Sequence, residues 1–204
     1  MKFICKLAAV LCLLGLLLSG AALMNDKSAL SNNLIRLHVI ANSDSQEDQM
    51  VKLKVRDAVL EEIRGITEIA ADRNEAYSLL TERLPGLQET ANRVLQAQGS
   101  TATATVELGE EAYPTRQYDT FSLPAGVYDS LRITIGDGEG QNWWCVVFPG
   151  LCLPTASDEV ADTAVSAGFS EDLGNTLTTQ DGYQVRFFLL DCIGWVENFF
   201  FNLS

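Results

Sequence analysis

Basic residues, histidines and closely spaced cysteines are all scarce in this 204-residue sequence. Only 14 lysines and arginines stand against 27 acidic residues, which gives a formal net charge of −13. Such a charge repels phosphate backbones, so nucleic acid is excluded first as a partner. With one histidine and no Cys-x-x-Cys spacing, the sequence offers a poor ligand set for a metal, and we expect neither a metal nor a cofactor.

The amino-terminal segment has the pattern of an export signal. Residues 1–6 are basic, residues 7–18 are uniformly apolar, and small residues follow at 19–22. This order is typical of a secretory signal cleaved after Ala21. An uncleaved anchor over 7–25 is the alternative, because about 20 apolar residues suffice to cross a bilayer. We therefore divide the chain into a signal peptide or membrane anchor (1–25) and a single exported domain (26–204).

Hydrophobic periodicity predicts an α+β fold for the exported part. It indicates an N-terminal strand, two helical segments, a mainly antiparallel sheet and a C-terminal strand or helix. Pro85-Gly86 interrupts the second helical segment without changing the phase of its apolar stripe, which favours one kinked helix or two collinear ones. The expected strands are 34–41, 101–108, 118–123, 128–135 and 143–148, the expected helices are 46–65 and 72–98, and 183–204 is expected to be a strand to about Leu190 and then a helix.

Glycines at 136, 138 and 140 suggest a phosphate-binding loop at first sight. Such a loop leads from a strand into a helix, whereas these glycines lead into Trp143–Phe148, which has strand composition. The carboxylates of Asp137 and Glu139 would also repel phosphate. The segment is therefore predicted to be a hairpin turn.

Candidate catalytic groups are few. His38 is the only histidine, and we expect it to be a structural residue that ties the first strand to the turn at 42–44. Paired acids such as Glu110-Glu111 could in principle serve a glycosidase, but adjacent exposed acids are usually only solvated. We therefore assign no catalytic residue.

Aromatic residues raise two further questions. Neighbours on a strand point to opposite faces, so Trp143 and Trp144 should place one ring in the core and the other against a helix or a partner. For Phe199–Phe201, core packing is the expectation and protein contact the functional alternative. No lysine or arginine follows Arg186, so an anionic bilayer is a poor fit.

Three cysteines lie outside the leader, in a compartment that permits oxidation. A bridge between Cys145 and Cys152 would close a small loop, and either could instead pair with Cys192. Buried free thiols are the remaining alternative.

Two long blocks of the sequence resemble one known family. LIRLHVIANSDSQEDQMVKLKVRDAVL at 34–60 resembles the opening of the stage II sporulation protein R family, and GVYDSLRITIGDGEGQNWWCVVFPGLC at 126–152 resembles its second signature. The resemblance implies a secreted signalling protein of an endospore former and not an enzyme. Such a protein passes from the forespore into the intermembrane space and activates a membrane-bound aspartic protease, which processes pro-sigma-E in the mother cell.

The resemblance supplies no catalytic residues, so the contact surface is our own hypothesis. We expect it around 42–48, the turn at 136–142 and an exposed tryptophan. The residues assigned to it are Asn42, Asp44, Asp48, Asp137, Asn142, Trp143 and Trp144. The membrane is expected to be met only through the N-terminal segment, by an anchor over 7–25. A secreted cell-wall hydrolase and a wall-binding module are the alternative functions.

Overall fold

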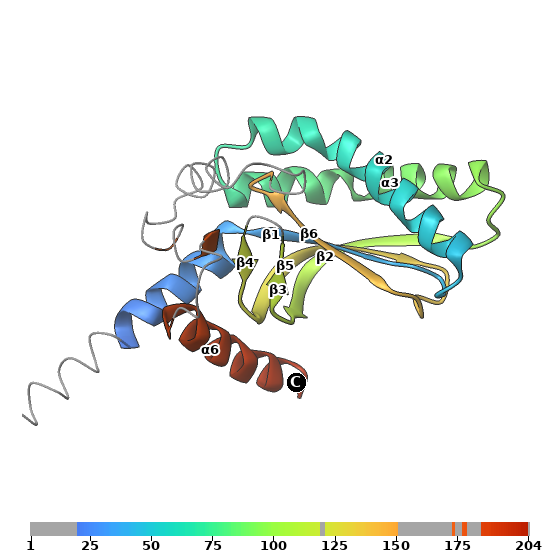
Figure 1. Ribbon diagram of the computed structural model, residues 1–204. Helices are drawn as coiled ribbons and strands as arrows, with labels where there is room; N and C mark the ends of the chain where they lie inside the picture. The colour runs from blue at the N-terminus through green and yellow to red at the C-terminus, as the bar shows by residue number, and fades with distance from the viewer. Residues whose placement is uncertain (1–19, 119–120, 151–172, 174–176, 179–184, 204) are drawn as a thin grey trace, which may run out of the picture.

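A mixed four-stranded sheet forms the centre of the computed structural model, which describes residues 20–118, 121–150, 173, 177–178 and 185–203 (Figure 1). The strand order is β2 (Ala104–Tyr113), β5 (Gly126–Ile135), β1 (Ile35–Ile40) and β6 (Asn142–Phe148). β1 runs parallel to β5, while β2–β5 and β1–β6 are antiparallel. The predicted α+β class with a mainly antiparallel sheet is confirmed.

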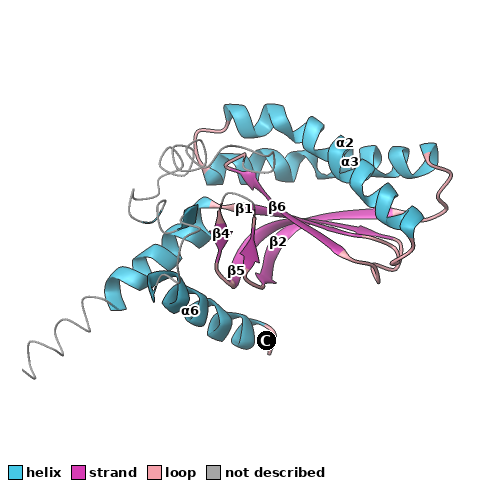
Figure 2. Cartoon of the chain, in the orientation of Figure 1, coloured by secondary structure: helices cyan, strands magenta, loops and turns pink. Residues whose placement is uncertain are grey.

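Two long helices, α2 (Gln46–Ile69) and α3 (Arg73–Ala97), cover one face of this sheet (Figure 2). Each begins at a capping side chain: Ser45 accepts a hydrogen bond from the Asp48 amide, and Asp72 accepts one from the Glu75 amide. α3 continues through Pro85 as one helix, as its unbroken apolar stripe predicts.

Gly65 does not end α2, contrary to our prediction. A helical glycine costs about 1 kcal/mol relative to alanine, whereas burial of Ile63 and Ile66 on either side of it keeps this stretch packed. The helix ends instead at Ile69, and the backbone of the following residue, Ala70, is extended.

The main hydrophobic core lies between the two helices and the sheet. Alternate residues of each strand supply one side of it, and the apolar stripes of α2 and α3 supply the other. Its fully buried members include Leu37, Val39, Val55, Val59, Leu80, Leu87, Ala91, Leu95, Leu131 and Ile133. Because these positions follow the predicted periods of two and 3.6 residues, this layer was readable from the sequence.

A second, smaller core lies on the opposite face, where helical residues 20–33 and α6 (Val185–Phe201) pack beside one another (Figure 1). A two-stranded hairpin, β3 (Arg116–Gln117) with β4 (Ser122–Leu123), lies on the same side. Of the single strand predicted at 118–123, residues 122–123 form β4, residues 118 and 121 are not strand, and residues 119–120 lie outside the described residues. The buried residues of this cluster include Leu30, Leu34, Tyr113, Phe121, Tyr128, Val146 and Leu190.

The loop between β5 and β6 is not the hairpin turn that we predicted. β1 lies between these two strands, so the loop passes over the end of β1. Adjacent strands are about 4.8 Å apart, so the connection must span about 10 Å instead of one strand spacing. Six residues, 136–141, are enough for that distance.

The C-terminal segment is helical from Val185, so the predicted strand to Leu190 is wrong for residues 185–190. The residues of this segment that face the rest of the protein recur every three or four positions, which fits only a helix. They are residues 190, 191, 194, 197 and 198. Core packing of the phenylalanines is also wrong for Phe199 and Phe200, which are 57% and 65% exposed.

Candidate functional site

The two predicted contact segments interlock at one end of the sheet. The amide of Gly140 donates to the Ala41 carbonyl at 2.9 Å, and the amide of Glu139 donates to the Asn42 carbonyl at 3.2 Å. The Asn42 side chain also accepts from the Asp137 amide at 3.1 Å. We call residues 41–45 and 136–141 together the double loop. The structure therefore brings together segments that lie about one hundred residues apart in the sequence.

Most predicted contact residues near the double loop have a structural task. Asp48 accepts hydrogen bonds from Asn42 and Ser43, and Asp44 accepts one from the Gln141 amide at 2.7 Å. The hydrogen bonds from Ser43 and then Asn42 lower the pKa of the Asp48 carboxyl. Asn42, Asp44 and Asp48 thus hold the two segments in register.

Lys52, on α2, links this helix to the double loop. Its ammonium group is nearly buried and donates to the Gln141 carbonyl at 2.8 Å and to Gln49 at 2.6 Å. Burial, and then the neighbouring charge of Arg56, lower the pKa of this lysine.

Gly140 permits the close approach of the two segments. A Cβ at this position would collide with the Ser43 carbonyl and with Ala41. We therefore expect Gly140→Ala to lower the free energy of unfolding by about 1 to 3 kcal/mol, the usual cost of overpacking. Urea denaturation would measure it, with Gly109→Ala as the control, since a Cβ at Gly109 meets nothing within 4 Å. Equal stability of the two variants would contradict the steric argument.

The outer surface of the double loop is acidic. Asp44, Glu47, Asp137 and Glu139 are exposed, and we call these four residues the acidic rim. Among the described residues, no ion pair engages any of them. The carboxylates of Glu47, Asp137 and Glu139 therefore face solvent and can meet a partner, whereas that of Asp44 also accepts the Gln141 amide.

The two tryptophans point to opposite faces, as predicted, but neither is fully exposed. Trp143 packs against the helix-facing core, with the Arg56 guanidinium 4.0 Å from its ring centre. Trp144 lies on the other face, stacked on His38 with ring centres 3.7 Å apart. Both rings are half-buried, so the exposed tryptophan of our hypothesis is absent at these two positions.

A row of polar side chains crosses that second face, with one residue from each strand. Glu111 on β2 bonds to His38 on β1 at 2.7 Å, and His38 bonds to Asn142 on β6 at 2.9 Å. Ser130 on β5 bonds to both Glu111 and the Tyr113 hydroxyl. Our expectation that His38 ties β1 to the turn at 42–44 is therefore wrong in its partners. The row links all four strands instead, and we call its members, Glu111, His38, Asn142 and Ser130, the cross-strand row.

Glu111 is the residue of this row that sequence reasoning missed. We expected the Glu110-Glu111 pair to be solvated, and we ended the strand at 108, whereas β2 continues to Tyr113. The alternation of residues 107, 111 and 113 onto one face is the signal that could have found it. The pKa of the Glu111 carboxyl is lowered. Desolvation of this half-buried group raises its pKa, but hydrogen bonds from His38 and Ser130 lower it by more.

Because its folded-state pKa is lowered, ionised Glu111 stabilises the protein above its ordinary pKa of 4.5, and this contribution is lost as the pH falls through the lower folded value. We expect Glu111→Gln to lower the free energy of unfolding at pH 7 by about 1 to 2 kcal/mol. The difference from the parent should shrink below pH 4.5. Denaturation curves at several pH values would measure it, with exposed Glu110→Gln as the matched control. A difference that does not vary with pH would contradict this account.

A buried arginine completes this face. Arg36 is fully buried on β1, with its guanidinium carbon 3.9 Å from the centre of the Tyr113 ring. One nitrogen donates to the Tyr118 hydroxyl at 2.7 Å, whereas its Nε and Nη1 have no hydrogen-bond partner among the described residues. Burial raises the pKa of Tyr113 and of Tyr128, so both phenols stay neutral. The positive charge of Arg36 is therefore stabilised by the faces of aromatic rings and by one hydroxyl group.

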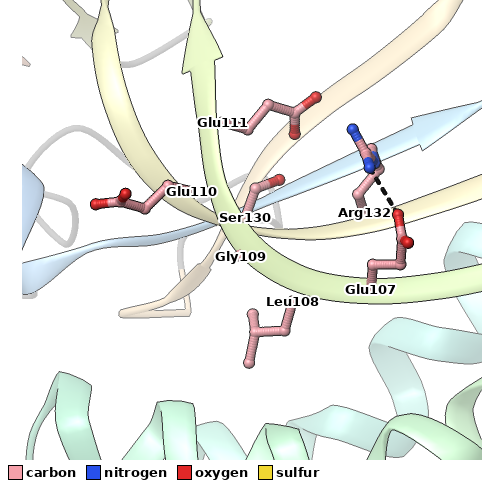
Figure 3. Close-up of a pocket in the computed structure, with 7 residues that line it drawn as sticks. All are labelled: Glu107, Leu108, Gly109, Glu110, Glu111, Ser130 and Arg132. Atoms are coloured by element: carbon pink, nitrogen blue, oxygen red, sulfur yellow. Dashed lines mark hydrogen bonds and ion pairs between the residues drawn. The ribbon is translucent and has the colours of Figure 1, made fainter. Parts of the chain in front are cut away.

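A pocket of about 240 Å³ opens beside the cross-strand row (Figure 3). Glu107 and Arg132 form an ion pair at 2.6 Å on one side of it, and the buried Oε2 of Glu111 has no hydrogen-bond partner in the part of the chain that the structure describes. Its lining residues are Glu107, Leu108, Gly109, Glu110, Glu111, Ser130 and Arg132. The volume lies below the usual range of ligand pockets, about 300 to 1,000 Å³.

The geometry offers little for chemistry. Within the described part of the chain, no serine or cysteine side chain bonds to His38, so no nucleophile is paired with this base. In the same residues, no group of three or more His, Cys, Asp or Glu side chains is placed to hold a metal ion. The polar row on this face links four strands, and the acidic rim is the candidate contact surface.

The structure shows the bonding state of two of the three cysteines outside the leader. Cys145 takes part in a disulfide, whereas Cys192 is a free, exposed thiol, so pairing through Cys192 is wrong. Residue 152 lies outside the described residues, and its pairing with Cys145 stays a prediction.

Comparison with known proteins gives a consistent result. The family model for stage II sporulation protein R matches residues 31–158. A curated relative, Stage II sporulation protein R of Bacillus subtilis (strain 168), is 30% identical over 225 residues, which cover 96% of this chain and 99% of the relative. No solved structure matches the chain.

Proposed function

Because this chain belongs to the stage II sporulation protein R family, we propose that it is an exported signal that activates a membrane-bound aspartic protease during sporulation. A role in sporulation follows from the family itself. The further steps are our proposal: export from the forespore into the intermembrane space, and protease activation that leads to cleavage of pro-sigma-E in the mother cell. The observation that carries it is the relationship along nearly the whole chain.

The architecture supports a signal that acts by contact. The polar row beside the pocket links strands and pairs its histidine with no nucleophile among the described residues, whereas the acidic rim carries carboxylates free of ion pairs there. Exposed charges of one sign raise the association rate with a partner of opposite charge and add specificity. We propose that the acidic rim meets a basic surface on the protease.

Deletion of the gene in its host tests the proposed function. We expect sporulation to halt with pro-sigma-E uncut, as followed by immunoblotting of the precursor, and the intact gene supplied elsewhere should restore cleavage. Normal processing in the deletion strain would contradict the proposed function.

Neutralising two rim charges tests the contact surface. In Asp137→Asn/Glu139→Gln the internal bonds of the double loop survive, because residues 137 and 139 enter them only through their backbone amides. We expect processing of pro-sigma-E to slow roughly tenfold, since loss of rim charges acts mainly on association. Glu82→Gln/Glu89→Gln on the exposed side of α3 removes the same charge elsewhere and is the matched control. Equal processing in both variants would remove the rim from the proposal.

A further inference from the structure

The C-terminal helix α6 has its polarity reversed relative to an ordinary surface helix, which buries an apolar stripe and exposes polar residues. One side of α6 is apolar and exposed, and so is Leu203, two residues after the helix. Trp195 is 69% exposed and Phe200 is 65% exposed. The large exposed apolar residues on this side are Phe188, Leu189, Trp195, Val196, Phe199, Phe200 and Leu203, and the exposed thiol of Cys192 lies among them. We call this set the outer face of α6.

The opposite side of α6 carries three polar side chains beside the buried Leu190, and it is bound to the protein. Asp191 accepts from the Ala125 amide at 2.7 Å, and Asn198 donates to the Tyr113 carbonyl at 2.7 Å. Glu197 accepts from the Val127 amide at 2.9 Å. These side chains satisfy backbone groups at the end of β2 and the start of β5, which would otherwise be left without partners.

These bonds fix the rotation of the helix about its own axis. Gly194 lies against the Ala125 carbonyl, where no larger residue fits, and Leu190 is fully buried one turn earlier. The helix cannot turn its aromatic residues inward without breaking all of these contacts. The outer face is therefore held toward the outside by the structure itself.

The helix that carries the outer face is tied to the helix that follows the apolar leader in the sequence. Lys27, in helical residues 20–33, forms an ion pair with Glu197 at 2.6 Å, so this helix and α6 are tied together (Figure 1). The chain that precedes residue 20 contains the twelve apolar residues 7–18. Met24 in the same helix is a further exposed apolar residue, at 55%.

From these observations we propose that the outer face of α6 docks on a lipid bilayer, lying in the boundary between headgroups and acyl chains. Exposed tryptophan and phenylalanine with aliphatic neighbours are typical of helices at that boundary. A protein partner fits less well, because protein interfaces carry about one hydrogen bond per 100–200 Å². The outer face offers only the Trp195 indole N–H and the Cys192 thiol.

The docking would depend on apolar burial and not on lipid charge. The outer face holds no lysine or arginine, and the chain has a net charge of −13, which opposes an anionic surface. α6 would lie on the bilayer, because no described helix is long and apolar enough to span one. This proposal adds a second membrane contact to the N-terminal segment, to which our sequence prediction confined it.

Fluorescence quenching of Trp195 tests this proposal on the full chain. The protein is bound to phosphatidylcholine vesicles whose acyl chains carry bromine, a quencher that acts only at short range. Subtracting the signal of Trp195→Phe isolates the contribution of this residue from those of Trp143 and Trp144. We expect most of the Trp195 emission to be lost on vesicles and retained in solution. Addition of phosphatidylglycerol should not increase the loss.

The readout reports on α6 even if the leader alone holds the chain on the vesicles. Phe199→Ser/Phe200→Ser should restore most of the Trp195 emission, whereas Met50→Ser/Ile69→Ser, which removes two exposed apolar residues from α2, should not. Full Trp195 emission on a vesicle-bound protein would overturn the proposal, and so would quenching only on anionic vesicles. Shielding of Trp195 from acrylamide in a lipid-free dimer would assign the face to a second copy and overturn it too.

Discussion

Replacing Gly194 by alanine is expected to lower the free energy of unfolding by about 2 kcal/mol or more, and to loosen α6 from the sheet. Two effects of opposite sign compete at this position. Alanine in a helix interior gains about 1 kcal/mol over glycine. A Cβ at 194, however, would overlap the backbone of Ala125, and a backbone atom cannot move aside as the end of a side chain can. The collision therefore dominates.

The consequence of Gly194→Ala reaches beyond one contact. Displacement of α6 also weakens the hydrogen bonds that Asp191, Glu197 and Asn198 make with backbone groups. Those groups then lose their partners, and an unpaired buried polar group costs about 1 to 3 kcal/mol. We expect hydrogen exchange at Ala125 and Val127 to accelerate along with the loss of stability.

Gly65→Ala is the matched control. Gly65 is also helical, but a Cβ there meets nothing within 4 Å, so only the gain in helix propensity remains. We expect this variant to be more stable than the parent by about 0.5 to 1 kcal/mol. Opposite signs for the two Gly→Ala variants in urea denaturation would support the packing argument. Equal and positive changes would show that α6 does not rest on Ala125.

Truncation of Trp144 to alanine is expected to destabilise the protein by about 3 kcal/mol, at the lower end for buried aromatic residues because the ring is half-buried. The ring stacks on His38 and meets Tyr113 edge-on at 4.8 Å, and the Arg116 guanidinium lies 4.8 Å from its centre. Its loss would leave the imidazole of the cross-strand row without its packing partner.

Comparing Trp195→Ala with Trp144→Ala distinguishes a tryptophan that stabilises the fold from one that is exposed for contact. Trp195 is 69% exposed, so its removal should change the free energy of unfolding by less than about 0.5 kcal/mol. The two variants are compared by urea denaturation and by processing of pro-sigma-E. If Trp144→Ala kept its stability but abolished processing, Trp144 would be the contact residue of our sequence hypothesis. A stability loss in Trp195→Ala equal to that in Trp144→Ala would contradict the burial argument.

Local patterns in the sequence predicted the helical layer well. Ser45 stands at the start of α2, and the apolar residues of α2 and α3 recur at helical spacing up to the core. Both signals depend only on residues a few positions apart, because a cap and a helical stripe are local features. For the same reason the opposite orientation of Trp143 and Trp144 followed from their being neighbours on one strand.

The candidate site was predicted in part. The two segments of the double loop were both named, but their interlocking makes Asn42, Asp44 and Asp48 structural and leaves Asp137 and Glu139 as the accessible pair. A side chain's hydrogen-bond partner one hundred residues away leaves no trace in local periodicity. The contact surface itself remains a prediction for the experiments above.

The sequence by itself determined the two long helices α2 and α3 nearly to their ends, the alternating residues of the main strands and the family that the chain resembles. Only the tertiary structure decided that β1 inserts between β5 and β6, and which side of α6 faces the sheet. A helical wheel separates the polar arc of α6 from its apolar arc, but it does not say which arc is buried. The polar arc faces the sheet because its side chains bond to backbone groups that would otherwise lack partners. Asp191, Glu197 and Asn198 make these bonds, with the backbone of Ala125, Val127 and Tyr113 respectively.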